Sequence, residues 1–76
     1  MRRKDEVLKK FGRYLTAIRE EKQLTIPALA AAAGLTPYQL RRIEAGEVDI
    51  LFTTVISLSR GLGISAGQLM QSLDPG

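Results

Sequence analysis

The segment from Thr25 to Gly46 contains the start and stop signals of two short helices, one directly after the other. Thr25 is a good N-cap residue, and Pro27 fits the first turn of a helix because the amide nitrogens there have no partner within the helix. Gly34 suits the position after the last helical residue, where the backbone turns left-handed. The spacing therefore predicts a helix, a tight turn and a second helix that ends at Gly46.

The second of these helices begins with a capping box. Thr36 is followed three residues later by Gln39, and Pro37 occupies the first helical position, where proline is favoured. A period of 3.6 residues per turn directs Leu40 and Ile43 toward the interior. The same period predicts an outward stripe of Tyr38, Arg42 and Ala45, flanked by Pro37 and Arg41 on one edge and Gln39 on the other.

Helical periodicity extends through the rest of the chain. A first helix is predicted over residues 5–22, with Gly12 in its interior at a cost of about 1 kcal/mol in helix propensity. We expect a close packing contact at this glycine. A fourth helix is predicted over 52–62, and a short fifth follows a second capping box at Ser65 and Gln68. The apolar residues that recur at helical spacing in the first and fourth helices are Val7, Leu8, Phe11, Leu15, Ile18, Val55, Leu58 and Leu62.

No segment shows the alternation typical of a strand, so the predicted fold is all-α, a compact five-helix bundle that contains a helix-turn-helix. The 76 residues suffice for one domain. We expect its core to run from about residue 8 to 70, with a basic N-terminal extension over 1–5 and a short tail over 71–76.

Composition excludes several classes of function. The chain has no cysteine and no histidine, which removes thiolate metal ligands and the commonest general base. We therefore expect no enzyme activity, no metal, no cofactor and no small-molecule ligand. The letters G-x-G-x-x-A from Gly61 to Ala66 match a dinucleotide-binding pattern, but they follow a predicted helix instead of a strand. No apolar segment has the length of a membrane span, and a cytoplasmic protein is expected.

Four groups of residues follow one another at fixed spacings. They are Gly12, Leu15, Ile18, Arg19 and Glu20 (G-x-x-L-x-x-I-R-E); Leu29, Ala30, Gly34, Leu35 and Thr36 (L-A-x-x-x-G-L-T); Leu40, Ile43, Glu44 and Gly46 (L-x-x-I-E-x-G); and Leu58, Leu62, Gly63, Ile64 and Ser65 (L-x-x-x-L-G-I-S). In this order the motifs resemble the Cro/phage-repressor (Xre-type) helix-turn-helix family, over about residues 11–70. The resemblance implies a sequence-specific transcriptional regulator that binds double-stranded DNA and places residues 36–45 in the major groove.

The resemblance also assigns roles to single residues. The positions that match base-contacting residues are Thr36, Pro37, Tyr38 and Arg42, with Arg41 adjacent. The residues expected to contact phosphate are Thr25, Ile26, Gln39, Arg13 and Lys22. Arg19 and Glu44 are expected to form a structural ion pair. Arg42 is suited to a bidentate contact with a guanine edge, and Tyr38 to a thymine methyl group or a phosphate.

Two departures from the family pattern oppose tight DNA binding. Ile26 stands where the family often has a phosphate-contacting glutamine, and Glu47 and Asp49 place negative charge in a turn that is often basic. Arginines on an exposed helix also commonly serve only to solvate it. A protein-interaction module of antitoxin or anti-repressor type is therefore the alternative hypothesis. It would hold a partner through Tyr38, Leu51, Phe52 or the fifth helix.

Positive charge near the start of the chain either attracts phosphate or simply solvates the first helix. The residues concerned are Arg2, Arg3, Lys4, Lys9, Lys10 and Arg13. Because one such module buries too little DNA for operator-grade affinity, we expect a homodimer on a two-fold site with half-sites about 34 Å apart. The fifth helix with Leu73 is one expected dimer surface, and Val7 or Leu8 on the first helix is the other.

Overall fold

Five α-helices account for most of residues 3–73, which are the residues that the computed structural model describes. The helices are α1 (Arg3–Glu21), α2 (Ile26–Ala33), α3 (Pro37–Glu44), α4 (Phe52–Leu62) and α5 (Ala66–Met70), followed by a 3₁₀ turn, η1 (Gln71–Leu73). The described residues form no strand. The all-α, five-helix fold predicted from the sequence is thereby confirmed.

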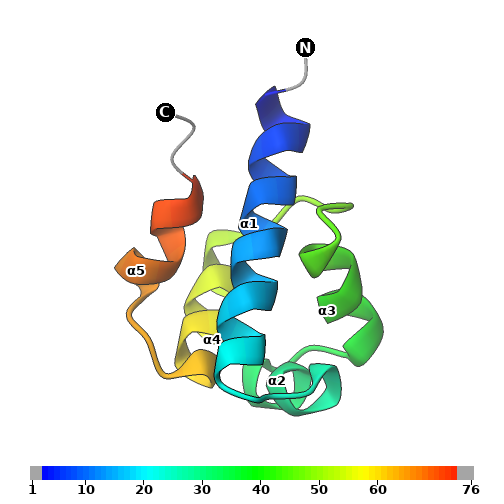
Figure 1. The fold of residues 1–76 in the computed structure, drawn as a ribbon. Helices are drawn as coiled ribbons and strands as arrows, with labels where there is room; N and C mark the ends of the chain where they lie inside the picture. The colour runs from blue at the N-terminus through cyan, green and yellow to red at the C-terminus, as the bar shows by residue number, and fades with distance from the viewer. Residues whose placement is uncertain (1–2, 74–76) are drawn as a thin grey trace.

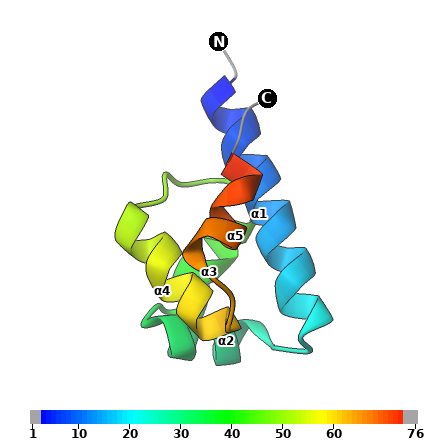
Figure 2. The ribbon, with the colours of Figure 1, turned by 90° about the vertical axis from the view of Figure 1, so that its left-hand side faces the viewer.

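The helices surround α1, the longest of them. In Figure 1, α1 runs through the middle of the molecule, with α3 on one side, α4 and α5 on the other, and α2 crossing near its carboxyl end. Figure 2, at a right angle to this view, shows the first turns of α1 extending past the other helices, at the end of the molecule where η1 lies. Contacts join α2 to α3 and α4, and α1 to α3 and η1. The helix-turn-helix of α2 and α3 is thus held from both sides.

The core contains side chains from all five helices. Its buried apolar members are Phe11, Leu15, Ile18, Leu29, Ala30, Ala33, Leu40, Ile43, Val55, Leu58, Leu62 and Leu69. Val7 and Leu8 lie in the projecting part of α1 and are half-buried. The predicted inward residues therefore do form the core, except where α1 extends beyond its neighbours.

Four of the helices end in the same backbone arrangement. In each, one amide donates three residues back and the next donates five residues back, which together form a Schellman motif. The motif requires a left-handed residue, and Gly34, Gly46 and Gly63 supply it with φ values of 72°, 72° and 73°. At the end of α1 the position is held instead by Gln23, with a φ of 60°. The glycine stops at Gly34 and Gly46 were predicted above, and the fourth helix ends at Leu62 as expected, just before Gly63; the strained glutamine was not predicted.

The predicted close contact at Gly12 is confirmed. A Cβ atom added there would lie 2.2 Å from the carbonyl oxygen of Glu44, so only glycine lets α1 approach the last turn of α3 this closely. The same crossing constrains Gly46, where an added Cβ would lie 2.7 Å from the Cα atom of Lys9. Two glycines on different elements thus set the distance between α1 and α3.

Three boundary predictions need correction. The core does not stop at residue 70, because Ser72 is buried and Leu73 packs against the core from η1. The first helix begins at Arg3, so part of the expected extension is helical. The predicted second capping box is only half formed, because the hydroxyl of Ser65 accepts from the amide of Gln68 at 3.0 Å but the Gln68 side chain does not accept from the amide of Ser65. The remaining tail residues 74–76, residues 1–2 and the side chain of Arg3 lie outside the described residues.

None of the helices within residues 3–73 combines the length and the apolar character that a membrane crossing needs.

Candidate nucleic-acid interface

The orientation of α3 is fixed at its start and along its inner side. The hydroxyl of Thr36 accepts from the amide of Gln39 at 3.1 Å, and the side-chain oxygen of Gln39 accepts from the amide of Thr36 at 2.9 Å, so the predicted capping box is complete. Leu40 and Ile43 are buried in the core. The opposite side of α3 is therefore presented to solvent by a rigid support.

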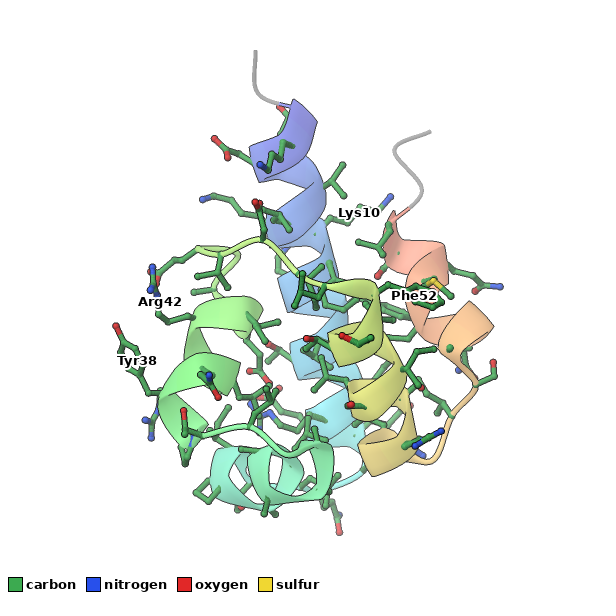
Figure 3. The ribbon with its side chains drawn as sticks, turned by 180° about the vertical axis from the view of Figure 1, so that it is seen from behind. Lys10, Tyr38, Arg42 and Phe52 are labelled. Carbon is green, nitrogen blue, oxygen red and sulfur yellow. The ribbon has the colours of Figure 1, made fainter. Side chains whose placement is uncertain are left out.

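Tyr38 and Arg42 dominate this outer side. Figure 3 shows both side chains pointing away from the bundle, and Tyr38 is 65% exposed. The Arg42 guanidinium lies over the Tyr38 ring, 5.9 Å from its centroid, which is cation–π distance. Thr36, Pro37 and Arg41 are also exposed. The structure therefore brings the five expected base-contacting residues to the accessible part of one helix and its N-cap.

Arg42 has a second neighbour that the sequence did not reveal. Its Nε donates to Oε1 of Glu47 at 3.4 Å, and the two side chains are 41% and 57% exposed. The pair forms because Gly46 turns the chain back, so that the amide of Glu47 donates to the carbonyl of Arg42 at 3.0 Å. The signal was the predicted glycine stop after α3, since a Schellman turn returns the following residue to the last turn of the helix.

The residues expected to contact phosphate lie on several elements. Thr25 is exposed at the start of α2, where its hydroxyl accepts from the amide of Ala28 at 3.1 Å. The side chain of Ile26 packs against the core, so this residue can offer only its backbone. The Gln39 oxygen is used in the capping box. Arg13 and Lys22 are exposed, on α1 and in the turn that follows it.

The basic residues of α1 lie on more than one side of that helix. Lys4 pairs with Asp49 at 3.1 Å, which places one of the two acidic residues of the turn beside a positive charge. Figure 3 shows Lys10 directed to the side opposite Tyr38 and Arg42. Arg2 and the Arg3 side chain fall outside the described residues. The Asp49 carboxylate is therefore a weaker repulsive element than the sequence alone indicates.

Arg19 and Glu44 come together behind the exposed stripe. Arg19 Nε donates to Glu44 Oε2 at 2.7 Å and Nη2 to Oε1 at 3.2 Å, with both side chains nearly buried. Nη1 of Arg19 donates to the carbonyl of Leu24 at 2.8 Å, and Thr16 donates to Glu44 Oε1 at 2.8 Å. The hydrogen bond to Glu44 raises the pKa of Arg19, although burial acts in the opposite direction. This bidentate pair connects α1, the turn before α2, and α3.

An apolar groove lies beside α3. It has a volume of about 260 Å³, and Tyr38 and Arg42 line it together with Val48, Ile50 and Leu51. Besides Tyr38, the large hydrophobic side chains that remain exposed among the described residues are Leu51, at 68%, and Phe52, at 65%. Figure 3 shows Phe52 at the start of α4, apart from Tyr38 and Arg42.

At the two dimer surfaces expected from the sequence, the apolar side chains named there are partly or fully covered by the rest of the protein. Leu69 of α5 is fully buried and Leu73 packs against the core, while Val7 and Leu8 are half-buried.

Within residues 3–73 no group of three or more acidic side chains is placed to hold a metal ion.

Comparison with solved structures finds close relatives of this fold. The restriction-modification controller protein C.AhdI from Aeromonas hydrophila is 29% identical, with a TM-score of 0.80 over 82% of this chain and 94% of that one. The clp gene regulator ClgR from Corynebacterium glutamicum is 24% identical, with a TM-score of 0.81 over 88% of this chain and 87% of that one. An HTH_3 family transcriptional regulator from Vibrio cholerae is 24% identical, with a TM-score of 0.83 over 95% of this chain and 40% of that one.

The sequence comparisons give a family for most of the chain. No curated protein matches it. The family described as "Helix-turn-helix domain" matches residues 10–73, nearly all of the described part. The resemblance to Cro/phage-repressor regulators is confirmed by this match and by the solved structures. The chain therefore belongs to the helix-turn-helix domain family.

Proposed function

We propose that this protein is a transcriptional regulator that binds double-stranded DNA at a preferred sequence, with α3 in the major groove. The observation that carries the proposal is the exposed Tyr38–Arg42 pair on the outer side of a helix whose inner side and N-cap are fixed. The similar structures are, by their own descriptions, a restriction-modification controller, a gene regulator and a transcriptional regulator. These descriptions support a regulatory role in place of a catalytic one.

Each exposed group has a place in such a complex. Arg42 would donate to the O6 and N7 acceptors of a guanine, and Tyr38 would contact a thymine methyl group or a phosphate. The start of α2, capped by Thr25, would face a phosphate because helix N-termini favour anions. A protein bound in this way blocks or recruits polymerase at a promoter, and it acts in the compartment that contains the DNA, here expected to be the cytoplasm.

We also propose that the active form is a homodimer that associates through Leu51 and Phe52. Phe52 is exposed at the start of α4, apart from Tyr38 and Arg42, whereas Leu51 borders the groove that those two residues line. An isologous contact centred on Phe52 would leave the outer side of both copies of α3 free for DNA. Replacing Phe52 with serine should shift the sedimentation coefficient to that of a monomer while the helical circular-dichroism signal is retained. A wild-type protein that sediments as a monomer at high concentration would remove this part of the proposal.

A salt titration tests DNA binding itself. Affinity for random duplex DNA should fall steeply as salt rises, because Lys and Arg contacts to phosphate release counterions. The protein-interaction hypothesis predicts no such binding at micromolar protein concentration. Selection of bound sequences from a random duplex pool then tests specificity, and a palindromic motif among the selected sequences would support the dimer.

A further inference from the structure

We propose that Glu47 is a specificity-determining residue, which holds Arg42 in an orientation suited to reading a base and makes it a poor ligand for phosphate. The inference rests on the proposed function, because it concerns how α3 selects a DNA sequence. Glu47 itself need not touch DNA. It acts through Arg42, and its role is to position that side chain.

The geometry divides the Arg42 guanidinium into an occupied and an available part. Glu47 accepts from Nε at 3.4 Å. The Arg42 guanidinium carbon lies over the Tyr38 ring, 5.9 Å from its centroid, so the ring is a second neighbour of the group. The two terminal nitrogens remain for an outside partner, and together they match the two acceptors of a guanine edge. Two neighbours thus restrict a long side chain before it meets DNA, which reduces the entropy lost on binding.

The charge of Glu47 separates the two kinds of acceptor that DNA offers. A phosphate that approached Arg42 would bring a second negative charge next to the Glu47 carboxylate, and the two would repel each other. The O6 and N7 atoms of guanine carry no net charge, so they meet far less repulsion at the same place. Glu47 therefore disfavours use of Arg42 on non-specific DNA more than on the correct base.

Asp49 offers a matched comparison. It lies in the same turn, it is similarly exposed, and its carboxylate pairs with Lys4 at 3.1 Å instead of with Arg42. Removing either charge reduces the repulsion between this turn and DNA by the same formal amount. Only removal of the Glu47 charge also releases Arg42. A difference between the two substitutions therefore isolates the positioning effect.

The experiment compares Glu47→Gln with Asp49→Asn, each in the full chain and each also combined with Arg42→Ala. Affinities are measured on the selected site and on a random duplex of equal length, over a series of salt concentrations. For Glu47→Gln we expect the ratio of selected-site to random affinity to fall roughly fivefold to tenfold, within the range that one bidentate base contact provides. On random DNA, the slope of log affinity against log salt concentration should steepen by about 0.9, as expected for one added phosphate contact.

Asp49→Asn should change both affinities by a similar factor and leave their ratio unchanged. In the Arg42→Ala background, Glu47→Gln should lose its effect on the ratio. Both single variants should melt near the wild-type temperature, because exposed ion pairs contribute little to stability. If Glu47→Gln leaves the ratio unchanged, or if Asp49→Asn lowers it equally, the inference is wrong while the proposed function stands. If the wild type shows no preferred site, the proposed function fails and the inference fails with it.

Discussion

Two arginine–glutamate pairs involve α3, and their surroundings are opposite. Arg19 and Glu44 make two hydrogen bonds, the shorter 2.7 Å, with side chains only 11% and 9% exposed. Arg42 and Glu47 make one at 3.4 Å, with side chains 41% and 57% exposed. The first pair is bound in place by Thr16 and Leu24, whereas the second borders solvent. An arginine–glutamate pair therefore stabilises the fold at Arg19 and Glu44, whereas at Arg42 and Glu47 it stays accessible to a binding partner.

The difference follows from solvation. A nearly buried charge that loses its partner cannot recover the hydration it gave up, so breaking such a pair is costly. An exposed pair loses little, because water and salt replace the missing group. The raised pKa of Arg19 agrees with this assignment. A raised pKa means that its stabilising contribution is complete at neutral pH and is lost only as the pH climbs past the titration of that arginine, beyond the ordinary working range.

The largest expected effect is that of Glu44→Ala. This change leaves the charged, nearly buried Arg19 with only the exposed carboxylate of Glu20, 3.9 Å away, and we expect the free energy of unfolding to fall by about 3–5 kcal/mol. Glu47→Ala is the matched control and should cost at most about 1 kcal/mol. Urea denaturation followed by circular dichroism measures both. Similar losses for the two variants would break the comparison between the pairs.

The next effect is that of Gly12→Ala, which tests the close crossing that brings Arg19 and Glu44 together. The added methyl group would overlap backbone atoms of Ile43 and Glu44, so α1 and α3 must separate. We expect a loss near the upper end of the usual range of about 1–3 kcal/mol for overpacking. Gly67→Ala in α5, where an added Cβ meets its nearest atom only at 4.0 Å, is the control. If Gly12→Ala left the free energy of unfolding unchanged, α1 and α3 would not be packed tightly at this crossing.

The exposed pair is tested by replacing Arg42 or Tyr38 with alanine. Either change should weaken binding to the selected DNA by about 1–3 kcal/mol and binding to random DNA by less. The melting temperature should stay close to that of the wild type, because both side chains point away from the core. Equal weakening on both kinds of DNA would show that these side chains contact only phosphate.

Much of the scaffold was predictable because its signals are local. Thr36 with Gln39, and Gly34 with Gly46, specify their caps through neighbours only a few residues away, and the structure has them where expected. The close contact at Gly12 was predictable for a different reason. Glycine lowers helix propensity, so a glycine inside a helix usually indicates that another element packs closely against it.

The features that were missed depend on the path of the chain as a whole. Glu47 was interpreted only as a charge that repels phosphate, because its pairing with Arg42 requires the turn at Gly46 to bring the two side chains together. Leu73 was assigned to the short tail after residue 70, yet contacts with α1 hold η1 in place and Leu73 packs against the core. No local propensity of glutamine predicts a left-handed Gln23.

The smallest expected effect concerns that residue. Gln23 is the one Schellman position among the four that is not glycine, and it immediately precedes Leu24, whose carbonyl accepts from Arg19. Gln23→Gly should relieve backbone strain and raise stability, by an amount of at most about 1 kcal/mol because glycine also gains entropy in the unfolded chain. DNA affinity should not change. A lower melting temperature would indicate that the Gln23 side chain makes a stabilising contact near the buried pair.

The glycine stop after α3 has a consequence for how this protein could acquire new targets. Position 46 must remain without a side chain, since its left-handed backbone and its approach to Lys9 both forbid one. Position 47, the next residue, is held by that fixed backbone at the rim of the surface that we propose faces DNA, whatever residue it carries. Natural mutation or a combinatorial library could therefore vary residue 47 together with the outer residues of α3 and change the preferred DNA sequence. The core residues and helix caps that determine the fold would stay the same.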